Sequence, residues 1–255
     1  MQRNWRTPAG FARDFGLIVA VMLFYFLLRA LPPERPELAA RVTRELIAFE
    51  RAVHIFVEPG WQSAALEHRF TRDLADALYT YLHFPVLALA GVMAWFHSRR
   101  AFELTRDTLF ISMVLGLAFY FLLPAAPPRL MAHLGYDYGF VDTIFGGGAR
   151  FAYVQPGFYV NDYAAVPSFH VGWIALSTVA MWVSVRGYVA KALTVVPTIA
   201  VAWASAATAN HLLIDMFIGG GVIAVAFVVA RTWTLANIAR SAHEHWPWRT
   251  GHTPT

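Results

Sequence analysis

The sequence predicts an all-α, polytopic membrane protein with six transmembrane helices and a layer of amphipathic surface helices between the first and second span. Of the 255 residues, 58% are hydrophobic and only 14% are charged, and the mean hydropathy is positive. Apolar runs recur along most of the chain, and their number suits one bundle at about 20 residues per span. Soluble domains do not combine these features. We therefore expect residues 1–255 to form a single membrane domain.

Proline-, glycine- and arginine-rich breaks separate the expected spans. The first apolar run ends at Pro32-Pro33 and is too long to be the core of a cleavable signal peptide. Three glycines at 219–221 lie in the last run, where small residues permit close helix packing. The spans are expected at residues 15–31, 75–96, 108–123, 167–185, 190–208 and 210–230.

Residues 34–74 have the pattern of surface helices. Apolar residues between Leu38 and Phe56 recur at helical spacing among arginines and glutamates, which is typical of a helix lying in the membrane surface. The break at Glu58-Pro59-Gly60 is expected to end this helix, and a second short helix follows. We expect four polar residues of this stretch to tie the layer down and not to act in catalysis: Glu50, Arg51, Glu58 and Gln62.

Basic residues gather on one side of the predicted bundle. The N-terminal segment, the 97–106 loop, the 186–191 turn and the C-terminal tail are all basic, and with six spans they share one face. The positive-inside rule makes that face cytoplasmic. The long 124–166 loop and the turn before His211 then lie at the outer face of the cell membrane. The net charge of +4 fits this topology, and the chain has no nucleic-acid-binding motif.

Polar residues lie at the expected starts of the fourth and sixth spans. Pro167 is expected to open a helix with Ser168 and His170 in its first turn, because a proline fits where no backbone N–H is needed. His211 and Asp215 are four residues apart, so we expect them on one face of the last helix. Helix N-termini bind anions. The two helix starts are therefore expected to face each other across a phosphate.

Each of these residues also has a plainer interpretation. His211 alone could be a hydrogen-bonded packing residue, and with Asp215 it could bind a metal, although no third ligand is apparent at helical spacing. Arg129 could anchor to lipid head groups, and Arg150 could be a solvated loop residue. Ionisable residues inside spans are costly and are usually functional. The clustering of polar residues near one membrane surface therefore favours a catalytic site.

Three short motifs resemble those of the type 2 phosphatidic acid phosphatase superfamily. Val166-Pro167-Ser168-Phe169-His170 resembles its P-S-x-H motif, and the stretch from His211 to Asp215 resembles the end of its third motif. Pro127-Pro128-Arg129 stands where the arginine of the first motif belongs. The Phe49-Glu50-Arg51 stretch and the Ala-Pro-Pro-Arg form of the first motif are similar to the inositol phosphorylceramide synthase-like branch (inositolphosphotransferases) and its bacterial members. The resemblance covers about residues 40–230.

The resemblance implies a mechanism that needs no metal or other cofactor. His211 would attack phosphorus and form a phosphohistidine, Asp215 would accept the other ring N–H, and His170 would carry the proton. The implied substrates are a phospholipid or isoprenoid phosphate and, as acceptor, a lipid alcohol or water. Three residues would hold the phosphate oxygens: Arg129, Ser168 and Arg150.

Two departures from the family pattern bear on the substrate. Leu122 stands at the lysine position of the first motif and Ser205 at the arginine position of the third, so one obvious cation remains. A phosphomonoester carries nearly two negative charges and a diester one. We therefore favour transfer of a phosphorylated, phosphoinositol-like head group from a diester donor, although Arg150 could replace a missing cation.

Two other functions stay open. One is a phosphatase for a lipid phosphate or an isoprenyl pyrophosphate, which would use the same residues. The other is a non-enzymatic transporter or scaffold with a degenerate enzyme fold. The intact set of His170, His211 and Asp215 argues against the second.

Overall fold

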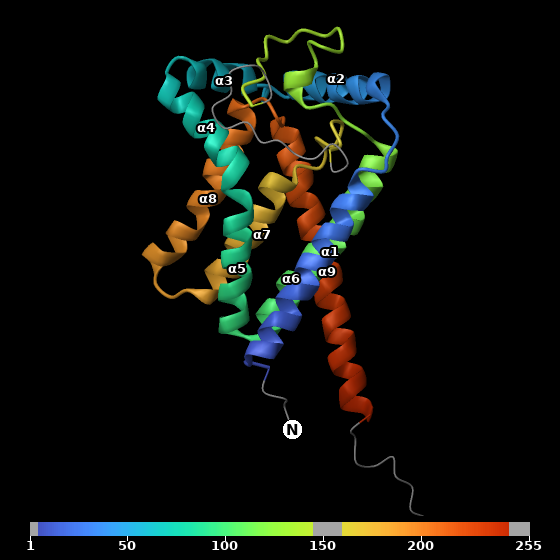
Figure 1. The fold of residues 1–255 in the computed structure, drawn as a ribbon, viewed down its shortest axis with the longest axis vertical. Helices are drawn as coiled ribbons and strands as arrows, with labels where there is room; N and C mark the ends of the chain where they lie inside the picture. Colours follow the sequence, from blue (N-terminus) through green and yellow to red (C-terminus); the bar gives the residue numbers. More distant parts are fainter. Residues whose placement is uncertain (1–4, 145–159, 245–255) are drawn as a thin grey trace, which may run out of the picture.

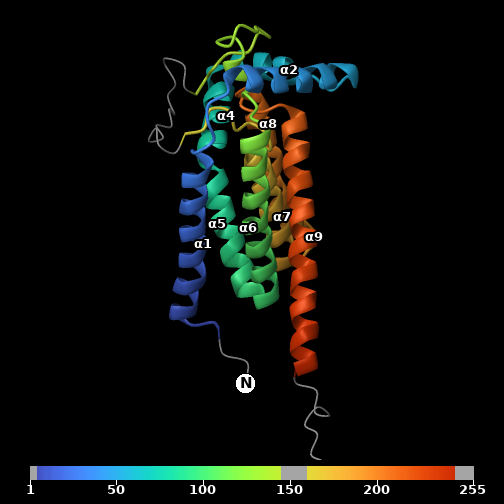
Figure 2. The same cartoon turned by 90° about the vertical axis from the view of Figure 1, so that its right-hand side faces the viewer.

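The computed structural model describes residues 5–144 and 160–244, with side chains to residue 233. Within these residues every regular element is helical, and the all-α class is confirmed. Long helices form a bundle, and two shorter helices lie across one of its ends (Figures 1 and 2). The elements are α1 Pro8–Arg29, α2 Pro36–Ala52, α3 Glu58–Leu66, α4 Arg69–Tyr81, α5 His83–His97, α6 Arg99–Leu122, the 3-10 turn Pro128–Leu130, α7 Phe169–Ser184, α8 Tyr188–Ala207 and α9 Leu213–Glu244.

The helices fit a membrane protein with four or five spans. In the described chain, α1, α6, α8 and the Leu213–Trp233 part of α9 are long and apolar enough to cross a bilayer. α4 and α5 qualify only as a pair, bent by 48° at Leu82. α7 has 16 residues, fewer than the roughly 20 that an upright span needs. All six predicted spans are thus largely helical, but six crossings stay a prediction.

Capping residues place several helix starts away from the predicted positions. α1 begins at Pro8, because the Thr7 side chain accepts a hydrogen bond from the N–H of Gly10 (3.0 Å) and proline suits the first turn. Glu58-Pro59-Gly60 was predicted to end the first surface helix, and this is wrong. α2 ends earlier, at Ala52, and Glu58-Pro59-Gly60 forms the first turn of α3, where proline is favoured. α4 begins at Arg69, so residues 69–74 belong to it and not to the surface layer.

The helices that carry the polar motifs also start later than predicted. α7 begins at Phe169 with Ser168 as its N-cap, so Pro167 lies outside the helix. α9 begins at Leu213, which leaves His211 in the turn before it. The Asp215 carboxylate accepts a hydrogen bond from the N–H of Leu212 at 2.8 Å. This contact from the first turn back to the cap resembles half of a capping box and sets the start of α9.

Glycines bring α7 close to α9 and α6. A Cβ at Gly219 would overlap the carbonyl oxygen of Ser168, and one at Gly116 would overlap the ring of Phe169. The predicted close packing is confirmed at Gly219, whereas Gly220 and Gly221 have open space around their Cα atoms. Close approach places the cap of α7 beside the first turn of α9.

α2 and α3 lie across the end of the bundle where α9 begins (Figure 1). The first turn of α1 and the last turn of α9 lie at the opposite end (Figure 2). Thr43 of α2 donates a hydrogen bond to the carbonyl oxygen of Ala126 at 2.8 Å, and Gln62 of α3 pairs with both backbone groups of Val141 at 2.8 and 2.9 Å. The surface layer therefore holds the segment that follows α6.

Candidate active site

His211 is buried and held by one ring nitrogen. Its Nδ1 lies 2.9 Å from the carbonyl oxygen of Ala165 and 3.7 Å from the nearer oxygen of Asp215. A carbonyl can only accept, so Nδ1 carries the hydrogen and Nε2 carries the lone pair. Nε2 is buried and has no hydrogen-bond partner among the described residues. The ring is thus oriented as a nucleophile would be, with its reactive nitrogen unoccupied.

Asp215 does two things at the start of α9. One oxygen accepts from the N–H of Leu212 and also faces Nδ1 of His211. The prediction made this carboxylate the acceptor of the ring N–H, but the Ala165 carbonyl is the nearer acceptor by 0.8 Å (3.7 against 2.9 Å). Asp215 therefore fixes the turn that carries the ring, and one of its oxygens faces Nδ1 of His211.

His170 lies beside His211, as the motifs predict. The two ring centroids are 5.6 Å apart. His170 stacks on Tyr79 of α4 at 4.2 Å and lies 4.9 Å from the ring of His83 at the start of α5. Sequence reasoning missed Tyr79 and treated His83 as incidental. The signal was available, because both are polar residues in the first half of the predicted 75–96 span.

The start of α7 offers donors to an anion. Ser168 is fully buried, and its hydroxyl has no partner among the described residues. The N–H of Gly172 bonds to the carbonyl oxygen of Ser168. The three N–H groups before it are the first of the helix and have no acceptor within it. Ser168 and this first turn can therefore bind phosphate oxygens.

The start of α9 is not available to an anion, which corrects half of the two-helix prediction. Glu58 accepts from the N–H of Leu213 at 2.6 Å, and Glu50 accepts from the N–H of Ile214 at 2.7 Å. Together with Asp215 these glutamates occupy the N–H groups at the positive end of the helix dipole. The expectation that they tie the surface layer down is met, and the point of attachment is the helix that follows His211.

Both glutamates are fully buried. Burial is the main cause that raises the pKa of Glu50 to about 8, and the nearby Glu58 and Asp215 raise it further, against the hydrogen bond from Ile214. Burial likewise raises the pKa of Glu58. At neutral pH the pair therefore retains a proton, which limits the negative charge collected beside His211.

Arg129 is fixed against the residue before His211. Its Nε donates to Asn210 at 2.9 Å, its Nη1 pairs with Asp142 at 2.9 Å, and its backbone N–H bonds to Ala209. Arg129 is thus close to the nucleophile, but Asp142 offsets part of its charge. The third predicted phosphate ligand, Arg150, lies outside the described residues.

Positions 122 and 205, where the chain departs from the family pattern, carry no cation. Leu122 is 69% exposed at the end of α6. Ser205 is fully buried, and its hydroxyl has no partner among the described residues. In the described chain, no group of three or more His, Asp or Glu side chains is placed to hold a metal ion.

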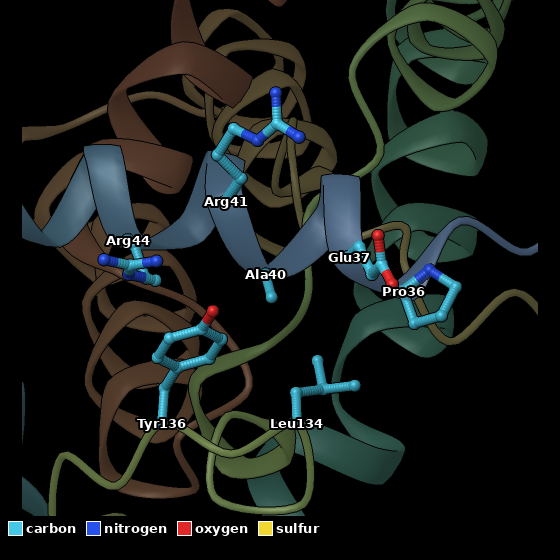
Figure 3. A pocket seen from close by; sticks show the side chains of 7 residues that line it. All are labelled: Pro36, Glu37, Ala40, Arg41, Arg44, Leu134 and Tyr136. Carbon is cyan, nitrogen blue, oxygen red and sulfur yellow. The ribbon is translucent and has the colours of Figure 1, made fainter.

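A separate groove of about 490 Å³ lies on the surface layer. Arg41 and Arg44 of α2 line one side, and Leu134 and Tyr136 line the other (Figure 3). Arg44 lies over the Tyr136 ring at 4.4 Å. None of the predicted catalytic residues lines this groove, so it is not the catalytic site.

Comparison with known proteins gives one match. A family model described as the PAP2 superfamily, the type 2 phosphatidic acid phosphatases, matches residues 44–230. No curated protein and no solved structure matches the chain. The matched range contains both histidines, Asp215, Arg129 and the two buried glutamates, and it excludes α1.

Proposed function

This chain belongs to the PAP2 superfamily, and on that premise we propose that it is a membrane lipid phosphotransferase that works through a phosphohistidine on His211. Family membership supports action on lipid phosphates, as a phosphatase or a phosphotransferase. The observation that carries the proposal is the Nε2 atom of His211, which is buried and unpartnered while Nδ1 is held by Ala165. His170 and Ser168 complete the surroundings that a phosphoryl group would require.

In the first step, Nε2 of His211 attacks phosphorus. The P–N bond forms as the bond from phosphorus to the leaving alcohol oxygen breaks, and His170 gives its proton to that oxygen. The ring of His211 gains positive charge, which the Ala165 carbonyl and Asp215 stabilise. Arg129, Ser168 and the first turn of α7 are placed to bind the phosphate oxygens.

In the second step, the hydroxyl of an acceptor attacks the phosphohistidine. The new P–O bond forms as the P–N bond breaks, the electron pair returns to Nε2, and the hydroxyl proton passes to His170. Both histidines are then back in their starting forms. A lipid alcohol gives transfer and water gives hydrolysis, and neither step uses a metal ion or other cofactor.

The charges near the site favour transfer from a diester. Asp142 partly neutralises Arg129, and no cation stands at position 122 or 205. The buried glutamate pair, even with one proton retained, adds negative charge beside the proposed nucleophile. A diester, with one charge, loses less from this shortage of cations than a monoester with nearly two. We therefore propose a phosphorylated head group as the group transferred, as in the inositolphosphotransferase branch.

The proposed location is the outer face of the cell membrane. The first turn of α1 and the last turn of α9 lie at the end of the bundle opposite the site (Figure 1). The basic N-terminal segment and tail support a cytoplasmic location of that end by the positive-inside rule.

Phosphorus NMR of the purified protein tests the function. Phosphatidic acid, an isoprenyl pyrophosphate and phosphatidylinositol are supplied separately, each with and without diacylglycerol as lipid alcohol, and His211→Ala is the control. A new phosphodiester that needs the acceptor and is lost in His211→Ala supports the transferase. Free phosphate from a monoester, lost in the same variant, would make the protein a phosphatase and refute the diester argument. Absence of turnover across the panel would favour a transporter or scaffold.

A further inference from the structure

α1 lies outside the range that matches the family, yet its end is attached to the site. Arg29 is its last residue. The side chain of Asn161 donates a hydrogen bond to the carbonyl oxygen of Arg29 at 2.9 Å. Asn161 belongs to the segment that leads into the Ser168 cap of α7. The end of α1 is therefore fixed at the same end of the bundle as the catalytic histidines (Figure 1).

The guanidinium of Arg29 faces the aromatic residues that surround the site. Its Cζ lies 5.6 Å from the ring of Tyr120. Tyr120 packs edge to face on Phe169, at 6.4 Å, and Phe169 lies between Ser168 and His170 in the chain. The Arg29 side chain therefore packs against a ring that itself contacts the residue between Ser168 and His170.

Arg29 has no acidic partner within the part of the chain that the structure describes. Among the described residues no carboxylate forms an ion pair with Arg29, and the sequence of residues 145–159 contains neither Asp nor Glu. An ionised side chain at the membrane is costly unless something compensates it. The Tyr120 ring offsets part of this cost through a cation–π contact. An anionic ligand would offset the rest.

The site needs such a cation. Leu122 stands at the lysine position of the first motif and is exposed, and Arg129 already shares its charge with Asp142. Leu122 ends α6 and Arg29 ends α1. These two helices are in contact in the bundle. A side chain from the end of α1 can therefore reach the region that a side chain from the end of α6 would otherwise serve.

We propose that Arg29 is a substrate-binding residue that holds a non-bridging oxygen of the lipid donor's phosphate. This inference rests on the proposed function and names a ligand of that site from outside the family's motifs. The competing interpretation is an arginine at a helix end that only contacts bulk lipid head groups. The two interpretations differ in one measurable respect. If Arg29 binds the substrate's phosphate, its replacement changes the affinity of the site for a small free anion. If Arg29 contacts only bulk lipid head groups, that affinity is unchanged.

The test uses orthovanadate and orthophosphate as probes on the full chain in detergent, where no bilayer is present. Arg29→Gln is expected to weaken anion binding by about 10- to 150-fold, which is the range for one charge-assisted hydrogen bond. Arg29→Lys should restore part of the loss, because it keeps the charge without the fork of donors. Arg13→Gln, at the other end of α1 where the side chain is 66% exposed, is the matched control. Binding is measured from the anion-dependent rise in Tm, so an unfolded variant is recognised at once.

The outcomes separate this inference from the proposed function. Equal anion affinity in Arg29→Gln and wild type overturns the inference, as does an equal loss in Arg29→Gln and Arg13→Gln. Failure of the wild type to bind either anion at millimolar concentration also overturns it. Anion binding that depends on Arg29, in a protein whose lipid turnover survives His211→Ala, would keep the inference and refute the phosphohistidine.

Discussion

Glu58 offers a sharp test of how the surface layer acts on the nucleophile. Its side chain is fully buried and accepts from the N–H of Leu213 at 2.6 Å, across 155 positions of sequence. Leu213 is two residues from His211. Replacement by alanine removes the acceptor and leaves a buried N–H at the start of α9 unpaired. Replacement by glutamine keeps an oxygen in the same place and removes only the charge.

The expected magnitudes differ for the two substitutions. The hydrogen bond from an N–H to a charged group contributes about 1.5–3 kcal/mol, and the one lost methylene contributes roughly 0.8 kcal/mol. Glu58→Ala should therefore destabilise the fold by about 2.5–4 kcal/mol and lower Tm by on the order of 10 °C. Glu58→Gln should stay within about 1 kcal/mol of wild type, since its acceptor and its volume are kept.

Activity should follow the position of His211 and not the stability alone. A shift of about 1 Å in a reacting group can reduce the rate about a hundredfold. At a temperature where each variant is fully folded, we expect Glu58→Ala to lose about this much in kcat with little change in KM, and Glu58→Gln to lose far less. The control is Glu67→Ala, an exposed glutamate at the other end of α3.

Two results would refute this reasoning. If Glu58→Ala matched Glu67→Ala in both Tm and kcat, the contact with α9 would have no role in the fold or the site. If Glu58→Gln lost as much kcat as Glu58→Ala while remaining stable, the charge and not the position would matter, and the surface layer would act electrostatically.

Three further predictions use the same structure. Because the pKa of Glu50 is raised from 4.5 to about 8, its contribution to stability is full below about pH 4.5 and is lost as the pH rises toward 8; Tm measured from pH 6 to 9 should fall less in Glu50→Gln than in wild type, and parallel curves would contradict this. Gly219→Ala should separate α7 from α9 and abolish turnover in the NMR assay, whereas Gly220→Ala, with open space around it, should behave as wild type. Asp142→Asn should free the charge of Arg129 and lower KM for a monoester more than for a diester, and equal changes would remove the electrostatic argument for a diester donor.

The positions of most helices could be predicted from apolar runs, because the hydrophobic effect depends on a long stretch of residues and is insensitive to where that stretch begins or ends. The end points depend on single capping contacts. Thr7 starts α1 earlier than hydropathy suggests, and Asp215 starts α9 later. The pattern of residues 69–97 predicted neither the length of α4 nor its bend at Leu82, since amphipathic residues 69–74 resemble those of the surface layer.

The site was predicted where its residues lie in short motifs. His170 and His211 come together as expected, and Ser168 presents an unpartnered hydroxyl beside them. Apart from Tyr79 and His83, the contacts that were missed join residues far apart in the sequence. Nothing in the local sequence near Glu50 indicates that it bonds to Ile214, 164 residues away, and Arg29 acquires its place only because α1 packs along α6.

The two helix starts at the candidate site differ in what occupies their N–H groups, and in the proposed mechanism each has its own role. At α9, carboxylates occupy the N–H groups of residues 212–214. In the proposed mechanism, negative charge there would stabilise the positive ring that His211 becomes when it bonds to phosphorus. At α7, the first turn and Ser168 keep their donors unoccupied and can bind the phosphate oxygens. If both starts bound the anion, the proposed nucleophile would lose this charge, so the proposed mechanism gives the buried glutamates a part in the chemistry as well as in the fold.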